Sequence, residues 1–155
     1  MRRLIFFIVA SLIIITSACA QNEDKSKEDS PINWLTNLEE AQEISKNEDK
    51  PIFVHFTGSD WCGWCFKLHD EVYSKQAFID YADSDLVMVV LDFPKKIKQP
   101  ANVKKYNRAI ADKYQITGFP TVLLLNSEGE VIAKTGFKYG GAEKYVVHLK
   151  ELLSK

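Results

Sequence analysis

Blocks of apolar residues, separated by polar and turn residues, recur along the chain and predict both strands and helices. Three short apolar runs have the length and composition of buried strands: 51–56, 86–91 and 122–125. Run 86–91 is apolar throughout, which is typical of a strand covered on both faces of a sheet. The polar segment 126–129 ends in glycine and predicts a hairpin turn into a last strand at 131–133.

Apolar residues three and four positions apart predict helices around these strands. Thr36 and Glu39 match a capping box, so the first helix should begin there and end near Asn47. Ser74 is expected to cap a further helical stretch. The other helices are expected over 62–73, 103–114 and 142–153.

The predicted order alternates helices with strands and closes with a hairpin. This order indicates an α/β fold with a central mixed sheet of four to five strands, parallel early and antiparallel at the end, flanked by helices on both faces. The chain of 155 residues is long enough for one domain with a sizeable core.

The first twenty residues have the pattern of an export signal. Two arginines precede a mostly apolar run over 4–15, which is short for a membrane span, and a small-residue exit follows at 16–20. Cleavage after Ala20 would fit this exit. A bacterial lipoprotein box that makes Cys19 the lipid anchor fits as well, and we favour it because a lone cysteine at this place is otherwise unexplained.

The chain is therefore expected to divide into a signal at 1–20, a flexible linker at 21–30 and a folded domain at 31–155. The linker contains only polar and charged residues, so it has no apolar surface to bury. The formal net charge of −1 at pH 7 argues against a nucleic-acid-binding protein. Lys95–Ala101 is a basic loop, which is either a solvated connection or a docking surface for an acidic partner.

The segment Trp61-Cys62-Gly63-Trp64-Cys65 carries the candidate chemistry. It follows a predicted strand and opens a predicted helix, where free N–H groups and the helix dipole stabilise a thiolate. We expect Cys62 to be the attacking thiol and Cys65, one turn further, to resolve the mixed disulfide. An inert crosslink is the structural alternative, although a bond across two residues restricts the unfolded chain very little.

Two further alternatives remain open for this segment. Cys62, Cys65 and His69 could together bind zinc or copper, since residues four apart on a helix lie on the same face. The chain could also be a non-catalytic interaction module that merely retains the two cysteines.

Three separated features make the folded part similar to the thioredoxin superfamily. They are the strand followed by Trp61-Cys62-Gly63-Trp64-Cys65, the segment Tyr114–Thr121, and the Glu128-Gly129 hairpin near the end. The similarity spans roughly Pro31 to Leu153. Within the superfamily, the chain most resembles the bacterial envelope branch related to the C-terminal domain of the transmembrane reductase DsbD.

The resemblance implies roles for residues outside the cysteine pair. Pro120 takes the position of the family's cis-proline, and the preceding Phe119 would touch both sulfur and substrate. Trp61 and Trp64 would form an apolar lip beside the sulfurs. Trp64 also marks a departure from standard thioredoxin. The two cysteines enclose Gly63-Trp64 instead of Gly-Pro, so the resemblance does not predict the redox potential.

A second departure concerns the strand before the cysteines. His55 stands where standard thioredoxin buries an aspartate, if one extra residue is allowed in the loop. It could relay a proton to Cys65, because the ordinary pKa of histidine lies near neutrality. It could equally be a core histidine whose hydrogen bonds are satisfied.

The resemblance implies a thiol–disulfide oxidoreductase of the bacterial cell envelope, located in the periplasm. Lipidation at Cys19, the favoured processing route, would anchor it to a membrane. We expect it to reduce, rather than oxidise or isomerise, disulfides in exported proteins. Its expected partners are those substrates and a membrane or periplasmic thiol electron donor, with no nucleic acid. No cofactor is expected, because the two sulfurs themselves carry the electrons, and the chain is expected to be a monomer.

Overall fold

The computed structural model describes residues 31–154 of the chain. The predicted signal at 1–20 with Cys19, and the predicted linker at 21–30, lie outside the described residues. The elements follow in the order α1 (Leu38–Glu48), β1 (Ile52–Thr57), α2 (Gly63–Leu68), the π-helical turn η1 (His69–Tyr73), α3 (Gln76–Asp85), β2 (Val87–Asp92), α4 (Ala101–Lys113), β3 (Thr121–Leu125), β4 (Val131–Thr135) and α5 (Gly141–Leu153).

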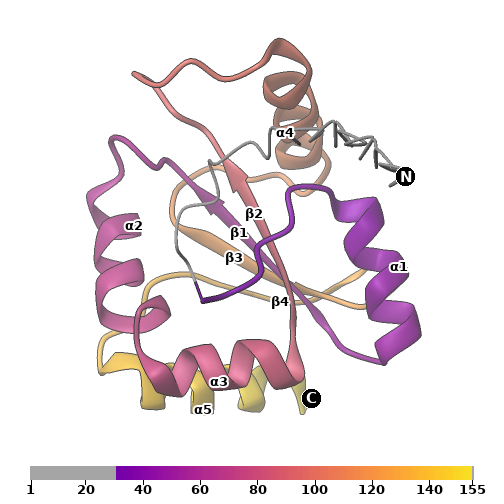
Figure 1. Cartoon of the computed structure of the whole chain (residues 1–155), viewed down its shortest axis with the longest axis vertical. Helices are drawn as coiled ribbons and strands as arrows, with labels where there is room; N and C mark the ends of the chain where they lie inside the picture. The colour runs from indigo at the N-terminus through magenta and orange to yellow at the C-terminus, as the bar shows by residue number, and fades with distance from the viewer. Residues whose placement is uncertain (1–30, 155) are drawn as a thin grey trace, which may run out of the picture.

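The four strands form one mixed sheet in the order β2-β1-β3-β4. β1 and β2 run parallel, with Ile52 opposite Val87, whereas β3 is antiparallel to both β1 and β4. This arrangement confirms the predicted mixed sheet, parallel early and antiparallel at the end. Figure 1 shows α1 and α2 at opposite ends of β1, so the cysteine segment lies at the carboxyl end of this central strand.

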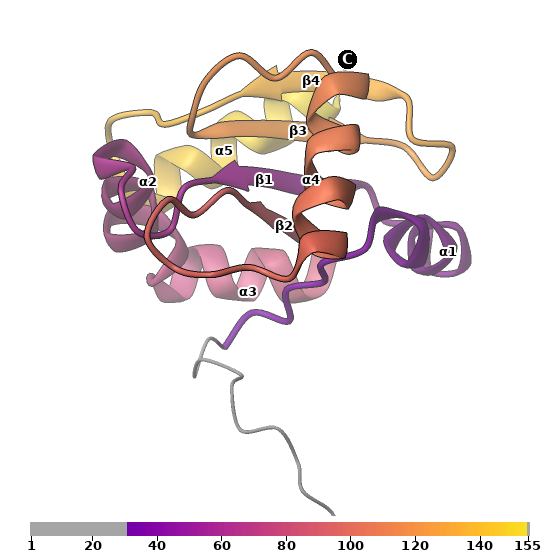
Figure 2. The same ribbon diagram turned by 90° about the horizontal axis from the view of Figure 1, so that it is seen from above.

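Helices cover both faces of the sheet, and each face has its own apolar core (Figure 2). One core joins α2, η1, α3 and α5 to the face of β1 that carries Phe53. The other joins α1 and α4 to the face that carries Val54 and Phe56. Because β1 is buried on both sides, its sequence is an apolar run instead of an alternating pattern.

Two predicted helix caps are wrong. The N-cap of α1 is Asn37, whose side-chain oxygen accepts a hydrogen bond from the Glu40 N–H at 2.7 Å, so the capping box at Thr36 and Glu39 is not used. The Asn37 carboxamide, one residue after Thr36, accepts from the third N–H of the helix. The helix therefore begins at Leu38.

Ser74 does not cap α3. Ser74 is instead the C-cap of η1, and its hydroxyl donates back to the Asp70 carbonyl at 3.0 Å. The N-cap of α3 is Lys75, which makes no side-chain capping bond. Within residues 31–154, no helix has both the length and the apolar character needed to cross a lipid bilayer.

Candidate active site

A disulfide between Cys62 and Cys65 lies where β1 gives way to α2. Cys62 is the N-cap of α2, and its Sγ accepts a hydrogen bond from the Cys65 N–H at 3.2 Å. A backbone N–H directed at this sulfur stabilises the negative charge of a thiolate after reduction. The arrangement therefore favours Cys62 as the nucleophile.

The two sulfurs are not distinguished by burial in the oxidised protein. Cys62 is 5% exposed and Cys65 is 4% exposed, so residue burial does not show which of the two attacks. The difference between them is their position, because Cys62 precedes the first turn of α2 and Cys65 lies within it.

Trp61 is fixed by contacts with two distant segments. Its indole Nε1–H donates to the Phe93 carbonyl at 2.8 Å, and its ring packs edge-to-face on Phe119 with centroids 5.7 Å apart. The Lys95 ammonium lies 3.8 Å from the ring centroid, which is a cation–π contact. Gly58 lies under the same ring, and a Cβ built on it would be 2.4 Å from Trp61 Cε2.

Trp64 belongs to a separate aromatic group, made of Trp64, Phe137 and Tyr139. Its ring lies 5.4 Å from Phe137 and 6.3 Å from Tyr139, and the Lys67 ammonium lies within 5.5 Å of all three centroids. Trp64 is 51% exposed and Tyr139 is 72% exposed. This group is an open aromatic surface at the start of the cysteine helix.

The Phe119-Pro120 peptide bond is cis, as expected from the resemblance. Phe119 packs against both Trp61 and Phe93, so it contacts the residue that precedes Cys62. Gly136, the residue after β4, lies against Pro120, where a Cβ would be 2.9 Å from the proline carbonyl oxygen. The structure therefore brings Trp61 and Phe119 together and places Trp64 beside the segment that follows β4.

Comparison with known proteins shows the family. Residues 38–149 match the model of the family described as "Thioredoxin-like domain". The chain belongs to the thioredoxin-like family.

Two named relatives come from Chlamydia pneumoniae. The chain is 41% identical to the disulfide bond reductase DsbH over 114 residues, which cover 74% of this chain and 69% of DsbH. It is 32% identical to the thioredoxin-related protein DsbJ over 129 residues, which cover 83% of this chain but only 36% of DsbJ.

Solved structures agree with this assignment. A structure titled "DsbH Oxidoreductase" has a TM-score of 0.75 and 39% identity, and the match covers 79% of this chain and 85% of that one. The oxidised C-terminal domain of Neisseria meningitidis DsbD shares the fold, with a TM-score of 0.53 and 15% identity over 77% of this chain and 98% of that one. The thioredoxin-like Cys62–Cys65 pair is accordingly the dithiol–disulfide couple of a thiol–disulfide oxidoreductase.

His55 lies in the interior of this thioredoxin-like domain, at 5% exposure on β1. Its Nδ1 is 3.3 Å from the Tyr73 hydroxyl, and its ring packs on Tyr73 and Trp34. Burial lowers the pKa of His55 to about 3, with a smaller contribution from the charge of His69. The pKa of His55 therefore lies far below the ordinary value of histidine, and the imidazole is neutral at physiological pH.

The structure gives no support to a metal site at the cysteines. His69 is exposed, and its Nδ1 pairs with Asp70 Oδ1 at 3.2 Å. In the part of the chain that the structure describes, no three His, Cys, Asp or Glu residues are grouped as metal ligands. The pair Cys62–Cys65 is instead closed as a disulfide.

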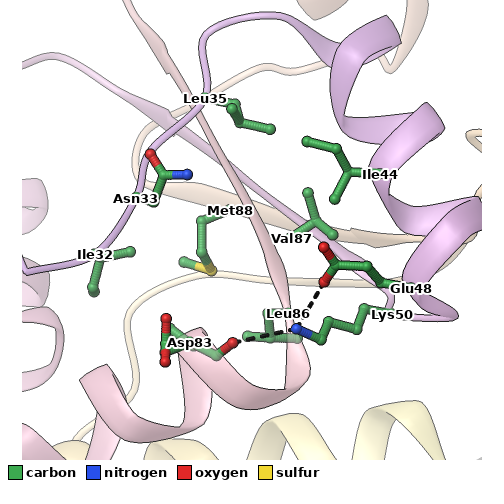
Figure 3. Close-up of a pocket in the computed structure, with 11 residues that line it drawn as sticks. Ile32, Asn33, Leu35, Ile44, Glu48, Lys50, Asp83, Leu86, Val87 and Met88 are labelled. Atoms are coloured by element: carbon green, nitrogen blue, oxygen red, sulfur yellow. Dashed lines mark hydrogen bonds and ion pairs between the residues drawn. The ribbon is translucent and has the colours of Figure 1, made fainter.

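Figure 3 shows a hollow of about 290 Å³ that neither cysteine lines. It lies beside the start of β2, where Lys50 pairs with Glu48 at 2.8 Å and donates to the Asp83 carbonyl at 3.4 Å. Val87, which lines it, is opposite Ile52 at the beginning of β1, whereas the cysteines follow the end of β1. This hollow is therefore not part of the redox site.

Sequence reasoning missed several residues of the site. Phe93, Phe137 and Tyr139 complete the two aromatic surfaces, but they lie 32 or more positions from the tryptophans, and no local pattern connects them. Gly58 was not singled out either, although a glycine between a buried strand and a tryptophan is a possible sign of close packing.

Proposed function

We propose that the protein is an exported reductase of protein disulfides that cycles through the Cys62–Cys65 pair. The observation that carries this proposal is the position of Cys62 at the N-cap of α2, where the Cys65 N–H is directed at its sulfur. The direction of electron flow is supported by the relative at 41% identity, which is named a disulfide bond reductase.

The reaction follows from thiolate chemistry. The Cys62 thiolate attacks one sulfur of a substrate disulfide, and the other substrate sulfur leaves as a thiolate. Cys65 then loses its proton and attacks Cys62, which releases the second substrate sulfur and closes the Cys62–Cys65 disulfide. Two electrons have passed to the substrate, so the protein needs a thiol donor, in the membrane or the periplasm, to become reduced again.

The aromatic residues around the pair form the proposed substrate surface. Trp61 and Phe119 form one part of this surface, and Trp64 with Phe137 forms the other part. The loop at Pro120 offers backbone groups to an extended substrate, in the manner of strand addition. Aromatic rings of this kind supply large contact areas at low cost in conformational entropy.

His55 is the proposed proton acceptor for Cys65. It lies on the face of β1 that packs against α2 and η1, next to Tyr73. A pKa of about 3 leaves the imidazole neutral and able to accept a proton, but it makes His55 a weak base at neutral pH. The role therefore requires that the proton is passed on as soon as Cys65 has attacked Cys62. Replacement by glutamine, which cannot take a proton, should slow resolution of the mixed disulfide without slowing its formation.

Export with lipidation at Cys19 completes the proposal. The linker at 21–30 would then hold the domain away from the membrane surface. Metabolic labelling with a radioactive fatty acid tests this directly. The wild-type protein should incorporate label and Cys19→Ser should not, whereas a label-free wild type with a mature N-terminus at Gln21 would assign simple cleavage after Ala20.

Trapping experiments test the reductase mechanism. Cys65→Ser should accumulate mixed disulfides with exported proteins, because nothing resolves the bond to Cys62. Cys62→Ser should accumulate none, since the attacking thiol is absent. Trapping on Cys65 instead would reverse the two roles, and no trapping by either variant would contradict the proposed activity.

The equilibrium potential of the pair against glutathione tests the direction. A value near that of thioredoxin, about −270 mV, is expected for a reductase. A value near that of DsbA, about −120 mV, would make the protein an oxidant or an isomerase.

A further inference from the structure

The loop between β2 and α4 is attached to the redox site through Asp60, two residues before the nucleophile Cys62. The Asp60 carboxylate accepts hydrogen bonds from three successive backbone N–H groups, those of Lys95 at 2.9 Å, Lys96 at 2.6 Å and Ile97 at 2.9 Å. These hydrogen bonds lower the pKa of Asp60, which keeps the carboxylate ionised and the attachment intact. The position of the loop is therefore set by a residue of the cysteine segment.

Two further contacts hold the loop against the same segment. The Trp61 indole donates to the Phe93 carbonyl at 2.8 Å, and Lys95 covers the Trp61 ring. At the start of the loop, the Asp92 carboxylate accepts from the Ser59 N–H at 2.8 Å. In Figure 1 this loop runs past the turn that connects β1 to α2, at the carboxyl ends of the parallel strands.

Residues 95–98, which we call the lysine arm, are exposed to solvent and carry three positive charges. Lys95, Lys96 and Lys98 are all exposed, and Ile97 is 61% exposed. Within residues 31–154, none of these three lysines forms an ion pair. The carboxylate nearest to the arm in the structure, that of Asp60, binds backbone amides. The ammonium groups of Lys96 and Lys98 therefore remain available to a carboxylate from another molecule.

We propose that the lysine arm selects substrate disulfides that are flanked by aspartate or glutamate. This inference rests on the proposed reductase function and adds a substrate class to it. A substrate sulfur bonded to Cys62 is attached one residue after Trp61, and Lys95 covers the ring of Trp61. Acidic residues next to the substrate cysteine would therefore come within reach of Lys96 and Lys98.

The fixed position of the arm favours a polypeptide over a membrane as its occupant. A lipid surface would need only a mobile cluster of lysines, whereas this arm is held by three hydrogen bonds to the cysteine segment. Exposed Ile97, between the lysines, also offers an apolar contact to a side chain of an extended substrate. Charges at the rim of an interface act mainly on the association rate and on its salt dependence.

Two matched peptide disulfides test the proposal. Each joins a fluorophore-labelled strand to a quencher-labelled strand, with the cysteine flanked by glutamate in one substrate and by glutamine in the other. The purified protein is reduced, freed of reductant and mixed with each peptide at 20 mM and 200 mM NaCl. We expect the glutamate peptide to be reduced about fivefold faster at low salt, and this preference to shrink at high salt.

Charge variants show which lysines cause the preference for the glutamate peptide. Lys96→Gln with Lys98→Gln should remove most of it and leave reduction of the glutamine peptide unchanged. Lys46→Gln with Lys150→Gln makes the same change of charge on exposed positions of α1 and α5, and should keep the preference. Asp60→Asn, which weakens the attachment of the arm, should reduce the preference with all lysines still present.

The outcomes separate this inference from the proposed function. Equal rates for both peptides with the wild type would overturn the selectivity and leave the reductase function standing. Failure to reduce either peptide, while dithiothreitol reduces both, would count against the reductase function itself. Equal rates, together with sedimentation on phosphatidylglycerol vesicles that depends on Lys96 and Lys98, would assign the arm to the membrane and overturn the proposal.

Discussion

Gly58→Ala is expected to disturb the redox site through a single methyl group. The Cβ of the new alanine would lie 2.4 Å from Trp61 Cε2 and 2.5 Å from Nε1, both of which are ring atoms that cannot move without the whole indole. The indole must therefore shift, and its hydrogen bond to the Phe93 carbonyl and its contact with Phe119 must change with it.

The magnitude can be estimated from these contacts. Overpacking a well-packed site costs about 1–3 kcal/mol. Loss of the hydrogen bond between the Trp61 indole and the Phe93 carbonyl adds about 1 kcal/mol. We expect the free energy of unfolding of the oxidised protein to fall by about 2–4 kcal/mol, as the sum of these two estimates.

Urea denaturation of the oxidised protein measures the stability, and reduction of a fluorogenic peptide disulfide measures the activity. Gly63→Ala is the matched control, because a Cβ at Gly63 meets nothing within 4 Å and alanine is favoured in a helix. It should leave stability unchanged or slightly raised. The double variant Gly58→Ala with Trp61→Ala should be more stable than the sum of the single effects predicts, since the clash is then removed.

Two results would refute this reasoning. If Gly58→Ala unfolds at the wild-type urea concentration, the site tolerates the methyl group and the indole is not tightly held. If Gly63→Ala is destabilised as much as Gly58→Ala, the loss arises from the segment in general and not from contact with Trp61.

Three further predictions concern the α1 cap, the buried histidine and the exposed aromatic group. Asn37→Ala should lower the free energy of unfolding by about 1 kcal/mol, and Thr36→Ala should change it less, because Asn37 is the residue that caps α1. Burial lowers the pKa of His55 to about 3 in the folded state, so the unfolded chain binds more protons below pH 6.5 and stability should fall as pH falls, by up to about 1.4 kcal/mol per unit. Denaturation at pH 4.5–7 should show a shallower slope for His55→Gln, and an equal slope would contradict the lowered pKa. Tyr139→Ala should raise KM for peptide disulfides about threefold without changing Tm, since Tyr139 is 72% exposed. Val147→Ala, at 56% exposure on α5, is its control, and a similar rise in KM there would contradict a local substrate contact.

The strands were predictable because a strand that is buried on both faces has a continuous apolar sequence. β1, β2 and β3 are covered on both faces, so each is a continuous apolar run with polar or turn residues at its ends. Helix caps were less predictable, because several residues in a row are able to cap. Thr36 and Asn37 both offer a side-chain oxygen, and the position at which the helix begins decides between them.

The chemistry of the site was predictable only where it is local. Cys62 and Cys65 form their disulfide within one helical turn, so spacing and context sufficed. The environment of His55 was not predictable, because its pKa depends on the tertiary burial of β1 and not on the residue type. A histidine that would titrate near neutrality in water is thereby held neutral.

The positive charge of the lysine arm was predictable from the sequence, but its attachment to the cysteine segment was not. Asp60 lies 35 to 37 positions before the three N–H groups that it binds. Asp92 is likewise bound by Ser59, which lies 33 positions away. Only the fold shows that both carboxylates are engaged by other groups while Lys96 and Lys98 stay exposed without an ion pair among the described residues. If the peptide preference depends on Asp60 as well as on the lysines, then the same carboxylate positions the charge of the arm and connects it to the cysteine segment.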